Sequence, residues 1–142
     1  VAAAVVDPEI PVLTIADLGI LRSVEVDGDD RVTVTITPTY SGCPAMRRIE
    51  ENLRQALFDA GYREVDVRTI LSPAWSTDWI TDEGRRKLAA FGIAPPGGEH
   101  EVVCPRCAAA MPRMVARFGS TACKALMVCS SCGEPFDWFK QL

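Results

Sequence analysis

Hydrophobic positions alternate with polar ones in two stretches of the first half of the chain. The run VTVTIT at 32–37 places valine or isoleucine at every second position, and REVDVRTIL at 63–71 repeats this pattern. A period of two is typical of a β-strand that turns one face to a core. With LRSVEV (21–26) before it and the turn signal Asp27-Gly28 between, the first run predicts a β-hairpin. The second run predicts a third strand.

Between these strands the hydrophobic period becomes that of an amphipathic helix. Apolar residues recur at intervals of three and four positions: Met46, Ile49, Leu53, Leu57 and Ala60. Gly61 is expected to end this helix in the left-handed conformation. A second helix is expected at DEGRRKLAAFG (82–92), and VAAAVVDPEIP (1–11) indicates a short helix that stops near Pro8.

These elements predict an α+β fold in the order helix, strand, strand, helix, strand, within a domain over 1–92. Residues 93–98 include the run Pro95 to Gly98, PPGG, which continues neither a helix nor a central strand, and they are interpreted as a linker. The remainder, 99–142, holds five of the six cysteines and is expected to form a separate minidomain.

Composition narrows the class of protein. Hydrophobic residues make up 48% of the 142 residues and charged residues 24%, as is usual for a soluble globular protein. No apolar run approaches the ~18 residues of a membrane-spanning helix, and VAAAVV lacks the basic flank of a signal peptide, so a cytoplasmic location is expected. The net charge is −4, and neither half has the basic excess of a nucleic-acid-binding protein.

The cysteines of the minidomain have the spacing of a metal site. CPRC and CSSC are separated by 21 residues, and each C-x-x-C turn can aim two sulfurs at one point. The predicted ligands of a structural Zn²⁺ ion are Cys104, Cys107, Cys129 and Cys132. Iron in the same cage and a redox dithiol remain alternatives. Cys123 is a fifth sulfur that either displaces one of these ligands or, as we favour, is a small buried apolar side chain.

The remaining cysteine, Cys43, stands alone in TPTYSGCPAM (37–46). Pro44 suits the first position of a helix, which makes Cys43 the expected N-cap residue. A sulfur there would meet free backbone N–H groups and the positive end of the helix dipole, which favour a thiolate. The position therefore predicts a nucleophile or a soft-metal ligand, against the alternative of a buried structural cysteine.

Two further groups of residues each allow two interpretations. Three carboxylates around DPEIPVLTIADLG could join Cys43 at a metal, although caps of local turns are the preferred interpretation: Asp7, Glu9 and Asp17. Four aromatic residues could form a partner-binding surface or could pack in the core: Trp75, Trp79, Phe136 and Trp138.

Four segments carry a resemblance that covers essentially the whole chain: DPEIPVLTIADLGILR, TPTYSGCPAM, LSPAWSTDWITDEGRRKLAAFGIAPP and the tail CPRC…CSSCGEPFDWFK. They resemble the PaaD (PaaJ) family, the D subunits of bacterial phenylacetyl-CoA epoxidase (oxygenase) systems. The first part also resembles the wider SufT-type family of iron–sulfur assembly factors.

The resemblance implies an accessory protein of aerobic phenylacetate degradation, which matures or delivers iron or an iron–sulfur cluster to the epoxidase complex. Its partners would be the reductase or the di-iron oxygenase subunits. The resemblance carries the role of functional thiol onto Cys43 and assigns zinc to the four cysteines of the tail. The alternative is a non-catalytic structural subunit of the same complex.

A standalone enzyme is not expected. The sequence has no Ser–His–Asp pattern and no phosphate-binding glycine loop, and its one histidine, His100, follows the expected linker. Whether two chains pair is left open by the sequence.

Overall fold

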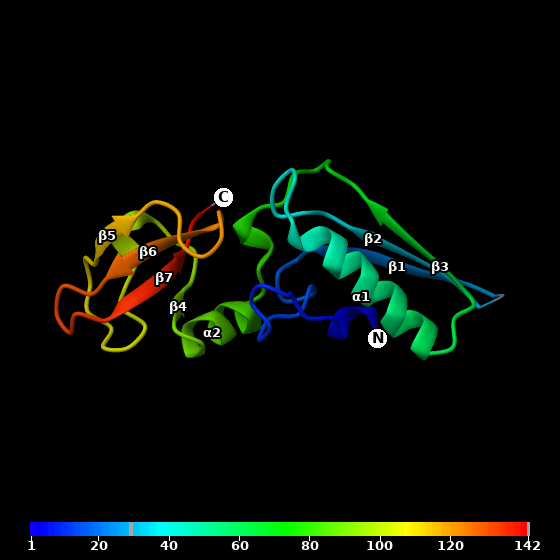
Figure 1. Cartoon of the computed structure of the whole chain (residues 1–142), viewed down its shortest axis with the longest axis horizontal. Helices are drawn as coiled ribbons and strands as arrows, with labels where there is room; N and C mark the ends of the chain where they lie inside the picture. Colours follow the sequence, from blue (N-terminus) through cyan, green and yellow to red (C-terminus); the bar gives the residue numbers. More distant parts are fainter. Residues whose placement is uncertain (29, 142) are drawn as a thin grey trace. The chain divides into compact units, whose positions relative to one another are not determined.

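The computed structural model describes residues 1–28 and 30–141, except the side chain of Glu99. The chain divides into two compact units, Val1–Thr81 and Asp82–Leu142 (Figure 1). No helix in the described part of the chain has both the length and the apolar character needed to cross a membrane.

The first unit contains a three-stranded sheet and one long helix. Its elements are η1 (Ala2–Ala4), β1 (Leu21–Asp27), β2 (Arg31–Ile36), α1 (Ala45–Asp59), β3 (Glu64–Thr69) and η2 (Thr77–Trp79). The sheet order is β1-β2-β3; β1 and β2 form an antiparallel hairpin, whereas β2 and β3 are parallel. The α+β class is confirmed. The helix expected at the start of the chain is a single 3₁₀ turn.

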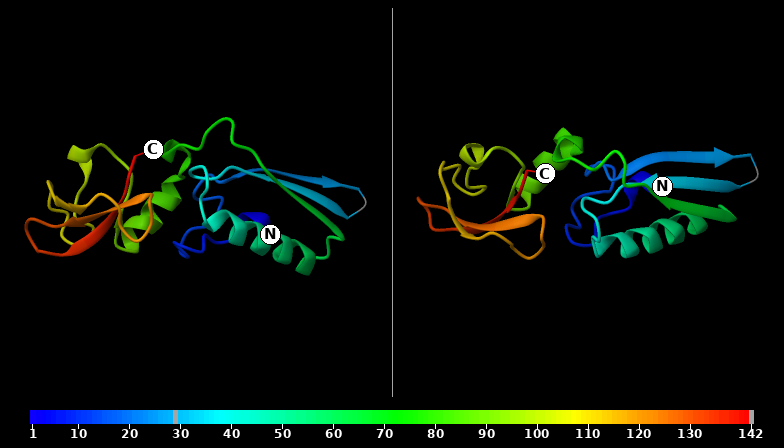
Figure 2. Two further views of the ribbon diagram at one scale, coloured as in Figure 1. Left: turned by 45° about the horizontal axis from the view of Figure 1, so that its top comes forward. Right: turned by 90° about the horizontal axis from the view of Figure 1, so that it is seen from above.

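Helix α1 covers one face of this sheet (Figure 2). The alternating residues Val32, Val34 and Ile36 of β2 are fully buried, whereas the threonines between them are partly exposed. The buried stripe of α1 consists of Ala45, Met46, Ile49, Leu53 and Leu57. Each large apolar side chain that is fully buried contributes roughly 1.5–3 kcal/mol. The two hydrophobic periods in the sequence therefore meet in one core.

Gly61 ends α1 as expected. Its φ is +102°, its N–H donates to Phe58 O, and the N–H of Tyr62 donates to Leu57 O. This pair of bonds is the Schellman arrangement, and it satisfies carbonyls that have no partner within the helix. The turn then sends the chain back along the sheet as β3.

The second unit is built on a four-stranded sheet of order β4-β7-β6-β5. Its elements are α2 (Asp82–Ala90), β4 (Ile93–Ala94), η3 (Glu99–Glu101), β5 (Arg113–Ala116), β6 (Lys124–Val128) and β7 (Pro135–Phe139). One face of the sheet carries the core of the unit, which is completed by Val102 and Cys104 from the segment before β5.

The boundary between the units differs from the expected one. Ile93 and Ala94, assigned to a linker in the sequence, pair in parallel with Asp137 and Trp138 of β7. Helix α2, expected in the first domain, falls in the second unit, which begins at Asp82. The reason is a strand pairing between segments more than forty residues apart. Local proline and glycine content does not reveal such a pairing.

Candidate functional site

The two C-x-x-C turns are built alike. Cys129 to Cys132 occupy the turn between β6 and β7, where Gly133 has φ +74° and donates its N–H to Cys129 O. At the first turn, Ala108 has φ +62° and donates its N–H to Cys104 O. The first turn directs one backbone N–H at its first sulfur and the second turn directs two, all at 3.4 Å. A left-handed residue directly after the second cysteine closes both turns.

The four sulfurs of these turns converge. They lie within 4.8 Å of one another, with Sγ–Sγ distances of 3.8 Å for Cys104–Cys132 and 3.5 Å for Cys107–Cys129. Tetrahedral coordination with metal–sulfur bonds of about 2.3 Å requires sulfurs about 3.8 Å apart. The donor set and its spacing fit a metal ion bound by four thiolates. Cys104 and Cys129 are buried, and the other two are exposed.

The thiols differ in acidity. N–H groups of Cys132 and Ser131 lower the pKa of the Cys129 thiol to about 6, because they stabilise its thiolate. For Cys132, the N–H of Glu134 acts in the same direction, but partial loss of hydration and the hydrogen bonds with the neighbouring sulfurs together prevail and raise the pKa to about 12. Four thiolates at this spacing repel one another, so full ionisation of the group requires a bound cation.

Cys43 lies elsewhere, in the loop that leaves β2 and enters α1. The thiol is free and the residue is half-buried, next to the exposed Ser41 and Gly42. Its backbone N–H donates to Tyr40 O, at 3.2 Å. Thr39 Oγ1 donates to Cys43 Sγ in a long contact of 3.9 Å. Sequence reasoning missed Thr39, although a hydroxyl four residues before a cysteine in one loop could have suggested it.

The expected N-cap assignment of Cys43 needs correction. Helix α1 begins at Ala45 with Pro44 as its N-cap, and no side chain caps it. Cys43 therefore stands one residue further from the helix, although its carbonyl accepts from Met46 N at 3.3 Å. Proline already has helical dihedrals here, but the helix proper starts one residue later than expected.

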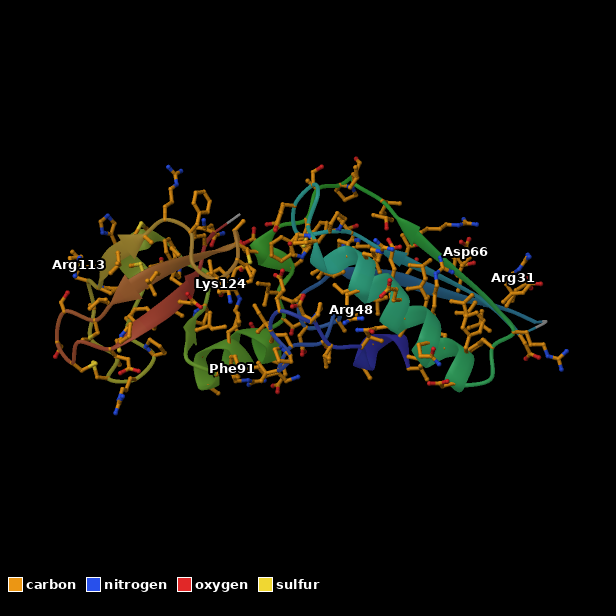
Figure 3. All side chains as sticks on the ribbon, viewed as in Figure 1. Arg31, Arg48, Asp66, Phe91, Arg113 and Lys124 are labelled. Atoms are coloured by element: carbon orange, nitrogen blue, oxygen red, sulfur yellow. The ribbon has the colours of Figure 1, made fainter. Side chains whose placement is uncertain are left out.

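The helix that follows Cys43 begins with two arginines. The first turn of α1 holds Arg47 and Arg48 and no acidic residue. Both arginines are well exposed, and their ion pairs with Glu51, at 3.6 and 3.7 Å, are surface pairs. Arg48 is labelled in Figure 3. The loop also lies at the carboxyl ends of the parallel strands β2 and β3.

The acidic residues of the first unit act in local turns. Asp7 Oδ1 accepts the N–H groups of Glu9 and Ile10, both at 2.8 Å. Asp17 Oδ2 accepts from Thr14 N, while Thr14 Oγ1 accepts from Asp17 N, each at 3.0 Å. These bonds support the capping interpretation. Within the part of the chain that the structure describes, the metal-type clusters found do not include any of these carboxylates.

Three of the four aromatic residues lie in cores, which favours the second of their two interpretations. Trp75 is buried and donates Nε1–H to Leu18 O at 2.8 Å. Phe136 and Trp138 are also buried, because they lie on the core face of the second sheet. Trp79 alone of the four is partly exposed, and the guanidinium of Arg22 lies 4.0 Å from its ring centre.

The fifth cysteine of the tail does not join the metal group. Cys123 is buried, at 7% exposure, and its sulfur lies 3.0 Å from Thr121 Oγ1. The metal-type cluster among the described residues comprises only the cysteines of the two C-x-x-C turns. This agrees with the preferred interpretation of Cys123 as a small buried side chain.

Comparisons with known proteins match each unit to a family model. The model described as "Iron-sulfur cluster assembly protein" matches residues 3–67, and the one described as "PaaD zinc beta ribbon domain" matches residues 91–140. A solved domain of unknown function, DUF59, from Bacillus anthracis is 27% identical and has a TM-score of 0.56. That similarity covers 61% of this chain and 83% of the other.

Two curated relatives complete the comparison. A "Fe-S protein maturation auxiliary factor" of Porphyromonas gingivalis is 38% identical, over 59% of this chain and 80% of its own length. One subunit of the "Putative 1,2-phenylacetyl-CoA epoxidase" of Escherichia coli is 50% identical, over 94% of this chain and 85% of its own length. With an assembly-type first unit followed by a Cys₄ ribbon, and half of its residues identical to this relative, the chain belongs to the PaaD family.

Proposed function

We propose that the chain is an accessory protein of phenylacetate degradation, which matures or delivers iron or an iron–sulfur cluster to a phenylacetyl-CoA epoxidase complex. Its partner would be a reductase or a di-iron oxygenase subunit in the cytoplasm. The proposal is supported by relatives that are named as an epoxidase subunit and as an iron–sulfur maturation factor. The chain itself does not perform the epoxidation.

The observation that carries the proposal is the free, half-buried thiol of Cys43. As the thiol binds iron, its proton leaves to solvent and a sulfur–iron bond replaces an iron–water bond. A thiolate or carboxylate of the client then replaces the Cys43 sulfur, which takes up a proton again. This is ligand exchange at iron, so it needs no electron donor. Among the described residues, a partner of the Cys43 sulfur is the hydroxyl of Thr39, which is not a general base, and such a thiol suits exchange better than covalent catalysis.

The ribbon would have a separate, structural role. We infer that its four thiolates hold Zn²⁺, which supplies a rigid tetrahedral crosslink to a unit with a small core. With all four positions taken by cysteine, the ion leaves none for water. Zinc chemistry would therefore not contribute to a reaction.

A second candidate function is a structural subunit of the epoxidase complex. It is favoured by the word "subunit" in the name of the relative that is 50% identical. In that case Cys43 would only pack in its loop. The protein would then remain bound to the complex in stoichiometric amounts.

One substitution separates the two functions. Cys43→Ser should lower the iron or sulfide content of the client several-fold in cells that express the epoxidase components together with this protein. The zinc content and the melting temperature of the variant should be unchanged, because Cys43 is not part of the four-cysteine metal group and is not a buried core residue. Iron and sulfide are measured by elemental and colorimetric analysis of the purified client.

The matched control is Cys123→Ala, which removes a cysteine that is buried in the second unit. It should leave the client fully loaded. Full loading with Cys43→Ser as well would refute maturation through this thiol and leave the structural role. Equal losses in both variants would also count against the proposal, because they would indicate a general effect of instability.

A further inference from the structure

Residues inside the two C-x-x-C motifs connect one turn to the other. Arg106 precedes the second cysteine of CPRC, and Ser130 follows the first cysteine of CSSC. Arg106 Nη1 donates to Glu134 Oε2 at 2.9 Å, and Ser130 Oγ donates to Met111 O at 3.0 Å. Each bond joins a residue of one turn to the segment that follows the other turn. The turns are therefore linked by contacts that do not involve their sulfurs.

The ion pair of Arg106 with Glu134 joins two residues whose backbone N–H groups serve different sulfurs. Arg106 N lies 3.4 Å from Cys104 Sγ, to which it donates. The N–H of Glu134 forms a hydrogen bond with Cys132 that stabilises its thiolate. The sulfurs of Cys104 and Cys132 are themselves a close pair, 3.8 Å apart. The ion pair thus connects the donors of two neighbouring sulfurs that come from different turns.

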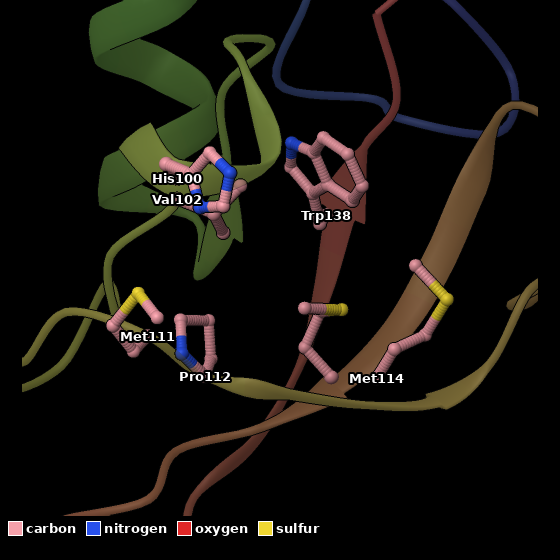
Figure 4. A pocket seen from close by; sticks show the side chains of 7 residues that line it. His100, Val102, Met111, Pro112, Met114 and Trp138 are labelled. Atoms are coloured by element: carbon pink, nitrogen blue, oxygen red, sulfur yellow. The ribbon is translucent and has the colours of Figure 1, made fainter.

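The bond from Ser130 holds a residue in an unfavourable backbone conformation. Met111 has φ +58°, in the left-handed region that a residue with a side chain disfavours. Its side chain is 65% exposed and lies at the wall of a hollow of about 350 Å³, beside Pro112 (Figure 4). Because that side chain is mostly outside the core, the bond from Ser130 is the contact that fixes the direction of the Met111 carbonyl.

The ion pair lies at the surface, so its effect is expected to be local. The side chains of Arg106 and Glu134 are 71% and 39% exposed. A surface ion pair of this kind usually adds little to the stability of a whole fold. Release of a metal ion, however, requires the sulfurs of the two turns to separate. Contacts outside the ligand shell oppose this, and replacing such contacts commonly weakens metal binding by about 10–100-fold.

We propose that the ion pair of Arg106 with Glu134 positions the sulfurs of Cys104 and Cys132 and thereby slows the release of the ion from the ribbon. The bond from Ser130 to Met111 is a second, separate restraint. Arg106 and Glu134 act through the cysteines, so they are positioning residues and not ligands. The inference rests on the proposed structural metal site of the ribbon and does not depend on the role of Cys43.

The test is the transfer of zinc from the reduced full chain to an excess of a chromophoric chelator. Arg106→Ala and Glu134→Ala should each speed the transfer about three- to tenfold, while the melting temperature of the zinc-loaded protein stays close to that of the wild type. Unchanged rates in both variants would overturn the proposal. The zinc content of the wild type is measured first, because a wild type without bound metal would refute the metal site itself and the inference with it.

The two single variants separate a restraint on position from a simple effect of charge. If only charge were important, Arg106→Ala would speed the transfer, whereas Glu134→Ala would slow it, because the latter removes a negative charge near the thiolates. An ion pair that holds the turns predicts faster transfer in both. The double variant should be no faster than the faster single one, because the same interaction is lost only once. Opposite effects of the single variants, or effects that multiply in the double variant, would overturn the proposal.

A conservative variant, the salt dependence and a matched control sharpen the result. Arg106→Lys keeps a cation opposite Glu134 and should restore most of the wild-type rate. A higher salt concentration should narrow the difference between Arg106→Ala and the wild type, because salt weakens an exposed ion pair. The control is Arg86→Ala, which removes an exposed ion pair with Glu83 on α2, at 2.6 Å, in the same unit. It should leave the rate unchanged, and an equal acceleration there would contradict the proposal.

Two further measurements test the second restraint and the integrity of the site. Ser130→Ala should speed the transfer about threefold, and its effect should add to that of Arg106→Ala, since the two bonds are separate. Ser131→Ala, at the neighbouring exposed position, should have no effect. Cobalt-loaded variants should keep the absorption of a tetrahedral four-thiolate site. Loss of that absorption in Arg106→Ala would mean that Arg106 is needed to form the site and not to retain its ion, which contradicts the proposal.

Discussion

Substituting Gly19 by alanine tests whether the close contact between Gly19, in the loop before β1, and Trp79 stabilises the first unit. Gly19 has φ +74°, and a Cβ there would lie 2.6 Å from both Cβ and O of Trp79. The left-handed conformation costs an alanine about 1–2 kcal/mol. Relieving an overlap with backbone in a packed region costs a further 1–3 kcal/mol or so. We therefore expect Gly19→Ala to lower the free energy of unfolding of this unit by about 2–5 kcal/mol.

The assay is urea denaturation followed by tryptophan fluorescence. A Trp138→Phe background leaves Trp75 and Trp79 as reporters, and both belong to the first unit. The matched control is Gly61→Ala, because Gly61 also has positive φ, at +102°, but an added Cβ there meets nothing within 4 Å. The control should cost only the conformational part, about 1–2 kcal/mol.

Equal losses of stability in the two variants would refute this reasoning. They would mean that Trp79 gives way at little cost, and that the close approach of the segment around Trp79 to Gly19 does not stabilise the unit. A larger loss for Gly19→Ala would show that this contact holds the loop in place.

Three further predictions concern the second unit, and the first of them has its control in the first unit. Lys124→Ala should destabilise the second unit by about 2–4 kcal/mol in chemical denaturation, because Lys124 is buried and pairs with Asp137 at 3.6 Å. Its control is Arg31→Ala, which removes the exposed ion pair of Arg31 with Glu64 and should lower stability by less than about 1 kcal/mol. Ala108→Gly should raise the melting temperature of the unit, since Ala108 has φ +62°; a lower value would contradict the turn geometry. Removing the metal with a chelator should speed amide exchange in α2 together with β4–β7 but not in Val1–Thr81. If amide exchange in α2 instead stays as slow as in the first unit after metal removal, α2 belongs to the first unit and the boundary lies at residue 92, as the sequence suggested.

The elements of the first unit could be predicted because two hydrophobic periods are clear in the sequence. The alternation over 32–36 and the stripe from Met46 to Leu57 each bury the residues that the pattern selects. Gly61 could also be predicted, because few residues other than glycine take positive φ at the end of a helix. These features depend on residues close together in the chain.

The domain boundary and the aromatic residues could not be predicted in the same way. β4 has two residues, and its pairing with β7 depends on contacts across more than forty positions. Trp75, Phe136 and Trp138 belong to segments rich in aromatic residues, but the sequence alone does not decide whether their side chains face a core or a partner. The structure places all three in cores.

The candidate functional residues also fall into a group that local sequence predicts and a group that it does not. The convergence of four sulfurs was predictable, because each C-x-x-C spacing fixes its own turn and two such turns suit one ion. The position of Cys43 was predicted one residue too close to the helix, since proline is compatible with both the N-cap and the first helical position. The Thr39 contact depends on loop conformation, which the local pattern does not specify.

The central claim is that the thiol of Cys43 binds the iron that the protein passes on. Its most direct test is anaerobic reconstitution of the purified, zinc-loaded protein with ferrous iron and sulfide, followed by iron X-ray absorption. The account predicts iron–sulfur scattering at about 2.3 Å in the wild type and its loss in Cys43→Ser, with four-sulfur coordination of zinc unchanged in both. Iron that binds equally well without Cys43, or only by displacing zinc from the ribbon cysteines, would contradict it.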